Sequence, residues 1–225
     1  MLLLILSDIH SNLEALNAVL EDAKQYSYEK IACCGDLVGY GPNPNEVCEW
    51  AINEKNKDGI FVMGNHDMDI SNNSSTFEYN PSARAVIEFQ RKIVSEQNKI
   101  FLKSLLLRQV FENILFIHGS PSYWCDYILD SCDASSNIKY MKNDICFIGH
   151  THRSAIWFDD KPKIINVGSV GQPRDGDARA CYVIFNTKTR EVITRRCEYD
   201  IVAVQDKMRK INMPNKLIDR LTKGE

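Results

Sequence analysis

The sequence lacks several features that would place it in a special class of protein. Its eight cysteines include no CxxC spacing and several lie inside apolar runs, which is typical of reduced, buried thiols in a cytoplasmic protein. The apolar run Met1–Leu6 is too short to cross a bilayer. No basic segment precedes it and Asp8 and His10 follow at once, so we expect no signal peptide, no membrane segment and a cytoplasmic location.

An excess of one charge is also missing. The chain has 27 lysines and arginines against 30 acidic residues, a net charge of −3, and no long block of one sign. This balance gives no general reason to expect tight binding to nucleic acid or to an anionic membrane. No repeat, low-complexity segment or linker divides the chain, so we expect a single domain over residues 1–225. The sequence leaves the oligomeric state open.

Short apolar runs and amphipathic segments alternate along the chain. A capping box at Ser11–Glu14 predicts one helix start, Asn45 is the expected cap of a second helix, and Ser71–Asn80 reads as a polar loop. Strands followed by helices, and then a run of strands, predict an α/β protein with one mixed sheet or two packed sheets. The expected strands are Leu2–Leu6, Lys30–Cys34, Gly59–Met63, Asn113–Ile117, Asp144–Ile148, Lys163–Val167 and the hairpin Ala180–Phe185 with Glu191–Cys197; further helices are expected at Ser82–Val94, at about Lys99–Leu107 and in the tail from Ile201, interrupted near Pro214.

Residue types that bind metals follow the first five expected strands. All five histidines of the chain lie at such ends, and binding sites in open α/β sheets form outside the carboxyl ends of the strands. His150 and His152 are one residue apart, so in an extended segment their side chains point the same way. The complete set is Asp8, His10, Asp36, Asn65, His66, Asp67, His118, His150 and His152.

These residue types indicate a mixed nitrogen and oxygen site without the thiolates of a closed structural zinc site. The candidates are too many for one ion. Two divalent ions that share a bridging carboxylate fit the inventory better, and such pairs act in phosphoryl displacement. We expect manganese first among the ions, with iron, nickel, cobalt or zinc as alternatives.

Five short motifs, taken in their order along the chain, resemble those of the calcineurin-like metallophosphoesterases. The motifs are Asp8-x-His10, Gly35-Asp36, Gly64-Asn-His-Asp67, His118 and Gly149-His-x-His152. The resemblance runs from residue 2 to about residue 186 and looks closest to a small prokaryotic branch that includes phosphodiesterases. Ser11 departs from the pattern because many members have glycine there, but it is not a ligand position.

The resemblance implies a four-layer αββα sandwich, in which helices flank two mixed sheets. It also implies two metal sites bridged by Asp36, and in-line attack on phosphorus by a hydroxide that the metals share. His66 would stabilise or protonate the leaving oxygen, and Asp67 would orient His66. One metal would be held by Asp8, His10 and His152, and the other by Asn65, His118 and His150.

Several of these roles have plain structural alternatives. A turn or cap role is the alternative to metal binding for Asn65, and a structural role as hydrogen-bond acceptor is the alternative for Asp67. Asn12 either contacts substrate or caps the first helix. Arg174 either binds a phosphate oxygen or forms a surface salt bridge.

Three aromatic residues bear on the nature of the substrate. Tyr123, Trp124 and Tyr127 either stack on a base, which would favour a nucleotide substrate, or serve ordinary packing.

The resulting prediction is a dinuclear metal-dependent phosphoesterase that hydrolyses small phosphate esters. A phosphodiester is favoured only by the branch that the chain resembles. Phosphomonoesterase activity, including protein phosphatase activity, is the alternative within the same class. A metal-binding scaffold for protein interactions is the alternative from another class, and the retention of His66 with all seven ligands argues against it.

Overall fold

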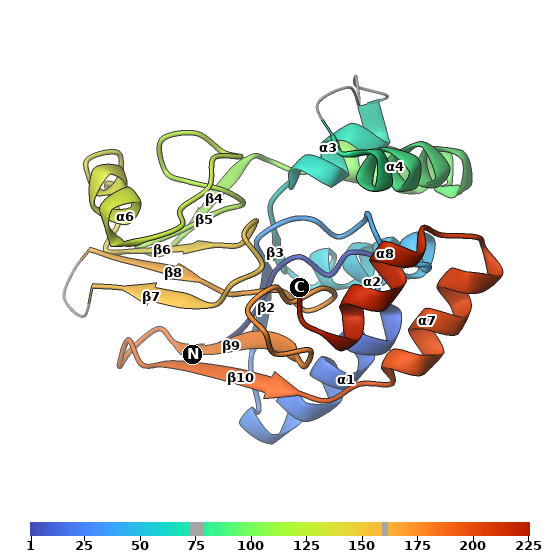
Figure 1. Ribbon diagram of the computed structural model, residues 1–225. Helices are drawn as coiled ribbons and strands as arrows, with labels where there is room; N and C mark the ends of the chain where they lie inside the picture. The colour runs from blue at the N-terminus through green and yellow to red at the C-terminus, as the bar shows by residue number, and fades with distance from the viewer. Residues whose placement is uncertain (73–78, 159–161) are drawn as a thin grey trace.

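Two mixed five-stranded sheets form the centre of the computed structural model, which describes residues 1–72, 79–158 and 162–225 (Figure 1). The first sheet has the order β10-β9-β1-β2-β3, with β1, β2 and β3 parallel. The second has the order β4-β5-β6-β8-β7, with β5, β6 and β8 parallel. The strands are β1 (Leu2–Leu6), β2 (Lys30–Cys33), β3 (Ile60–Phe61), β4 (Arg108–Phe111), β5 (Ile114–Ile117), β6 (Ile145–Ile148), β7 (Ala155–Trp157), β8 (Lys163–Asn166), β9 (Ala180–Asn186) and β10 (Val192–Cys197).

The two sheets pack face to face, and strand β1 shows how. Alternate side chains of a strand point to opposite faces. Leu3 and Ile5 face the second sheet, where they share an apolar cluster with Phe116 and Phe147, whose stacked rings have centroids 5.6 Å apart. Leu4 and its alternating neighbours instead pack under the helices of the first sheet. The predicted αββα sandwich of two mixed sheets is therefore confirmed.

Helices cover the outer faces of both sheets, as Figure 1 shows. The helix α6 packs over the second sheet, whereas α1, α2 and α5 pack against the first. In the parts of the chain that the structure describes, no helix is long and apolar enough to span a membrane. The helices are α1 (Leu13–Ala23), α2 (Pro44–Lys55), α3 (Asn65–Asn72), α4 (Pro81–Ile93), α5 (Glu96–Lys103), α6 (Ser131–Ile138), α7 (Ile201–Lys210) and α8 (Asn215–Asp219), with 3₁₀ turns η1 (Lys24–Tyr26) and η2 (Arg220–Thr222).

The structure corrects two predicted helix starts. Asn12, not Ser11, is the N-cap of α1, because its side chain accepts a hydrogen bond from the Ala15 N–H. The second helix begins at Pro44, and Asn45 lies inside its first turn. Asn45 instead accepts a hydrogen bond from the backbone N–H of Ser95, so it joins two helices rather than capping one.

Other boundaries also differ from the prediction. The helix expected at Lys99–Leu107 is α5, which begins at Glu96 because Ser95 caps it. The helix α3 includes Ser71 and Asn72, which the sequence predicts to lie in a polar loop, and residues 73–78 of that loop lie outside the described residues. Strands β4 and β7 and helix α6 were not predicted. The two strands form the opposite edges of the second sheet, where β4 pairs antiparallel with β5 and β7 pairs antiparallel with β8.

Candidate metal centre

The loops that follow β1, β2, β3, β5 and β6 meet at one place between the two sheets. Backbone hydrogen bonds connect them, including Asp8 N–H to Gly35 O at 3.0 Å and Gly149 N–H to His118 O at 2.9 Å. The carboxyl ends of parallel strands lie at the same edge of a sheet, which is why these loops converge. The prediction that all five histidines gather at strand ends is confirmed by this arrangement.

The backbone at this place is strained. Left-handed φ values are uncommon for residues other than glycine, and they cluster at functional sites. Here five of the seven expected ligands have a positive φ, which aims their side chains inward from tight turns. They are Asp8 (φ 52°), His10 (49°), Asp36 (53°), His150 (67°) and His152 (60°).

One group of candidate ligands consists of Asp8, His10 and His152, all buried. The Nε2 atoms of the two histidines are 3.0 Å apart, and that of His152 lies 3.3 Å from Asp8 Oδ1. The Nδ1 atoms face backbone carbonyls, of Val38 at 2.9 Å and of Gln172 at 2.6 Å. A proton held on Nδ1 by a carbonyl leaves Nε2 free to bind a metal.

The second group consists of Asp36, His118 and His150, with Asn65 beside them. His118 Nε2 lies 3.4 Å from Asp36 Oδ2 and 3.1 Å from Asn65 Oδ1, while its Nδ1 faces the Cys34 carbonyl at 2.8 Å. Asp36 Oδ2 also lies 3.6 Å from Nε2 of His10 in the first group. Asp36 therefore stands between the two groups.

The electrostatics of both groups suit divalent cations. Asp8 Oδ1 is buried and, within the described residues, has no hydrogen-bond partner. Burial raises the pKa of Asp8, but the nearby His152 and His118 together outweigh that effect, so the net pKa is lowered. Burial lowers the pKa of His118, but the carboxylates of Asp36 and Asp8 and the Cys34 carbonyl together outweigh burial and raise the pKa to about 9. A cation that binds between a buried carboxylate oxygen and the imidazole nitrogens that it faces would compensate the carboxylate charge. The residues therefore fit a metal site with mixed nitrogen and oxygen ligands.

His66 and Asp67 lie next to the ligands. The backbone N–H of His66 donates to Asp36 Oδ1 at 2.9 Å, and the centroid of the His66 ring lies 5.0 Å from that of His10. Burial lowers the pKa of the His66 imidazole. Asp67 accepts hydrogen bonds from the backbone N–H groups of Val38 and Gly64, at 3.1 and 2.9 Å. In the described structure no hydrogen bond joins Asp67 to the His66 ring, whose Nδ1 has no partner. Asp67 therefore has the structural role of holding two ligand-bearing loops, and its orienting of His66 stays a prediction.

Asn12 and Arg174 have different surroundings. Asn12 is 1% exposed, caps α1 and donates from Nδ2 to Gly171 O at 2.9 Å, so the capping alternative is confirmed and a substrate contact stays a prediction. Arg174 lines the pocket at the metal centre. Within the described ranges it makes no ion pair, so the surface salt bridge that was the alternative role for Arg174 is not formed. Its guanidinium lies over the ring of Tyr40, 5.5 Å from the centroid.

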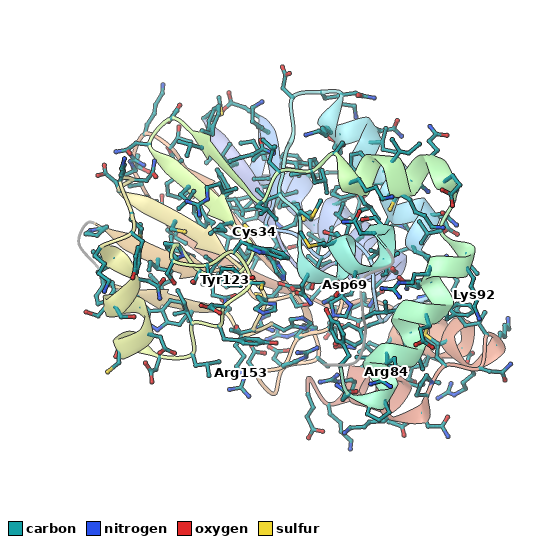
Figure 2. The ribbon with its side chains drawn as sticks, turned by 90° about the horizontal axis from the view of Figure 1, so that it is seen from above. Cys34, Asp69, Arg84, Lys92, Tyr123 and Arg153 are labelled. Carbon is teal, nitrogen blue, oxygen red and sulfur yellow. The ribbon has the colours of Figure 1, made fainter. Side chains whose placement is uncertain are left out.

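A pocket of about 670 Å³ opens at both groups of ligands. Tyr127 stacks on His150 with ring centroids 4.0 Å apart, so one face of its ring already takes part in the packing that was the alternative to stacking on a base. Figure 2 shows two flanking elements, with Asp69 on α3 and Tyr123 on the loop after β5. The pocket is lined by Asp36, Tyr40, Asn65, His66, Met68, Asp69, Tyr79, Asn80, Ser82, Trp124, Cys125, Tyr127, His150, His152, Arg174, Lys216, Leu217 and Arg220.

Sequence reasoning missed residues that hold the ligands in place. Ser7 donates to Asp8 Oδ2 at 2.7 Å. Gln90 on α4 is fully buried; it accepts from the Gly39 N–H and donates to Gly41 O, both at 2.7 Å. It thereby fixes the turn that carries Tyr40. An amide on the apolar face of an amphipathic helix was the signal available for Gln90.

Comparison with known proteins agrees with this geometry. The calcineurin-like phosphoesterase superfamily domain matches residues 1–190. An uncharacterized protein from Methanocaldococcus jannaschii is 39% identical over 98% of this chain and 97% of its own length. The crystal structure of a metallophosphoesterase from Sphaerobacter thermophilus has a TM-score of 0.89 and 35% identity, covering 100% of this chain and 99% of its own. A hypothetical protein from Pyrococcus horikoshii shares the fold, with a TM-score of 0.88 and 21% identity over 100% of this chain and 98% of its own. The chain belongs to the calcineurin-like phosphoesterase superfamily, a family of phosphoester hydrolases.

Proposed function

We propose that this chain is a dinuclear metal-dependent phosphodiesterase. The observation that carries the proposal is the position of Asp36, whose Oδ2 lies 3.6 Å from His10 Nε2 in one group and 3.4 Å from His118 Nε2 in the other. A single carboxylate between two sets of buried donors is the arrangement that two ions would share. We further propose manganese as the resident ion and the cytoplasm as the place of action.

Asp8, His10 and His152 would hold one ion, and Asn65, His118 and His150 the other, with Asp36 shared. When bound, the ions would supply Lewis-acid chemistry and lower the pKa of an attacking water. The protein contributes orientation, because backbone carbonyls fix Nδ1 of His10, His118 and His152 and so aim their Nε2 atoms.

Two side chains beside the ligands would act on the phosphoester itself. His66 is 4% exposed and lines the pocket, so it would hold a proton close to the leaving oxygen. Arg174 lines the same pocket, and its guanidinium would bind a non-bridging phosphate oxygen. Asp67 would act through the backbone, since its two hydrogen bonds hold the loops that carry Asp36 and His66.

A small chromogenic diester tested beside a monoester decides the class of reaction. Metal-stripped protein is supplied with Mn²⁺, and turnover of bis-p-nitrophenyl phosphate is compared with that of p-nitrophenyl phosphate. Faster cleavage of the diester is the expected result. Faster cleavage of the monoester would assign the chain to the phosphomonoesterases instead. Binding of two ions without cleavage of either compound would favour the scaffold.

A further inference from the structure

The C-terminal tail supplies basic residues to the pocket. Lys216, Leu217 and Arg220, from α8 and η2, line the wall that also contains Arg174. They lie beyond residue 190, where the match to the superfamily domain ends. Figure 1 shows α8 beside α7, on the side of the first sheet that α1 and α2 also cover.

Apolar contacts fix the tail against the metal centre. Leu217, Ile218 and Leu221 are buried in one cluster with Tyr40. Gln205 of α7 donates to the Ile218 carbonyl at 2.8 Å. The Tyr40 ring in turn lies 4.7 Å from that of His10, edge to face. The tail is thus held in place by packing that reaches a candidate metal ligand.

Positive charge accumulates along this wall. Lys216 lies in α8 and Arg220 begins the 3₁₀ turn η2 that follows it, and both side chains line the pocket. Across the part of the chain that the structure describes, no side-chain carboxylate forms an ion pair with Arg174, Lys216 or Arg220. Arg220 Nε donates to the main-chain oxygen of Glu225, which leaves its two terminal nitrogens for a ligand, and Arg174 Nε is buried without a hydrogen-bond partner. Burial lowers the pKa of Arg220 to about 10, and repulsion from Arg174 contributes. An anion on this wall would relieve that repulsion.

Arg174 lies between the metal centre and the tail. Its backbone N–H donates to the His152 carbonyl at 3.1 Å, and its charge acts on His66 and His152 on one side and on Arg220 on the other. A phosphate at the metals would occupy Arg174, which leaves the two tail cations for another group. The pocket volume of about 670 Å³ admits a ligand larger than one phosphate ester.

We propose that Lys216 and Arg220 bind a second phosphate of the substrate, so that the chain prefers phosphoesters carrying at least two phosphate groups. The proposal rests on the proposed function, because the first phosphate must lie at the metal centre. Phosphate is the anion that the wall suits best, since a guanidinium and an ammonium together offer a planar fork and a point charge to its oxygens.

Two matched diesters test the proposal. Thymidine 5′-(p-nitrophenyl phosphate) and its 3′-phosphorylated counterpart share the reacting phosphorus and the leaving group, and differ only in the added phosphate. We expect kcat/KM to be at least about tenfold higher for the 3′-phosphorylated diester with the wild-type protein. Calorimetric binding of thymidine 3′,5′-bisphosphate beside thymidine 5′-phosphate gives the same comparison without turnover.

The variant Lys216→Gln/Arg220→Gln identifies the residues responsible. Its kcat/KM ratio between the two diesters should fall to near one, and the ratio cancels any general loss of activity. Lys223→Gln is the matched control. The Lys223 side chain lies on the same tail, is 60% exposed and is not among the residues that line the pocket, so this variant should have the same kcat/KM ratio between the two diesters as the wild-type protein. Circular dichroism melting curves check that each variant folds.

The outcomes separate this proposal from the proposed function. Equal cleavage of both diesters by the wild-type protein would overturn the second-phosphate site alone. A ratio retained in the double variant would do the same. Failure to cleave either diester with any added metal would overturn the phosphodiesterase proposal and this one with it.

Discussion

Gly149 is the position where the smallest change should remove a metal ligand. A methyl group added there would lie 2.3 Å from Asp8 Oδ2 and 1.9 Å from Ser7 Oγ. Ordinary contacts begin near 3.4 Å, so the Asp8 carboxylate would have to retreat by about 1.1 Å. Metal–ligand distances tolerate only about 0.2 Å. Gly149→Ala should therefore cost the first group its carboxylate ligand.

We expect the dissociation constant of the ion at Asp8, His10 and His152 to rise at least about 100-fold, or about 2.7 kcal/mol. Overpacking should also lower the free energy of unfolding by about 1–3 kcal/mol. The assay is isothermal titration of metal-stripped protein with Mn²⁺, accompanied by urea unfolding of the metal-free form.

Gly59→Ala is a suitable control for the steric effect. Its added methyl group would lie 2.7 Å from both Glu54 O and Phe61 Cε2, away from the ligands. This variant should lose stability and still bind two ions. Two ions bound to Gly149→Ala with wild-type affinity would refute the reasoning, because the carboxylate would then not need its present position.

Four further changes test separate parts of the account. Asp36→Asn should lose both ions and all turnover, whereas two-metal content in that variant would contradict a shared carboxylate. His66→Gln should keep both ions and slow alkoxide leaving groups more than p-nitrophenolate; equal slowing would exclude an acid role. Because the pKa of His118 is about 9, an ion that binds the second group at pH 7 must displace a proton from this ring. The affinity for that ion should therefore rise about tenfold per pH unit from pH 7 to 9 in titrations at three pH values, and an affinity that does not change with pH would contradict this. Phe147→Ala should lower the free energy of unfolding by about 3–5 kcal/mol in urea, since the ring is fully buried between the sheets; a loss below 1 kcal/mol would contradict that packing.

The sequence predicted the sheets and the gathering of ligands well, for a clear physical reason. Strands that are buried on both faces have continuous apolar sequences, and polar residues that are not part of the core follow at their ends. The edge strand Arg108–Phe111 escaped prediction because its sequence, Arg-Gln-Val-Phe, is not a continuous apolar run, and its place in the sheet follows from its antiparallel pairing with Ile114–Ile117. Ser131–Ile138 escaped because it is short and weakly apolar.

Local roles within the site were harder to predict. The residue types at Asp67 and Asn12 allow several hydrogen-bond partners, and only the folded chain selects among them. Asp67 bonds two backbone N–H groups because the turn at Val38 and the turn at Gly64 come together beside it. The tail of the chain carries no motif at all, so its place in the pocket wall emerges only from packing around Tyr40.

The central claim is that two ions at one carboxylate produce phosphodiester hydrolysis, and a stoichiometric titration tests it most directly. Mn²⁺ is added stepwise to metal-stripped protein while turnover of bis-p-nitrophenyl phosphate and bound metal are measured together. The account predicts that turnover reaches its plateau at two ions per chain and is absent from Asp36→Asn. Full turnover at one ion per chain, or none with two ions bound, would contradict it.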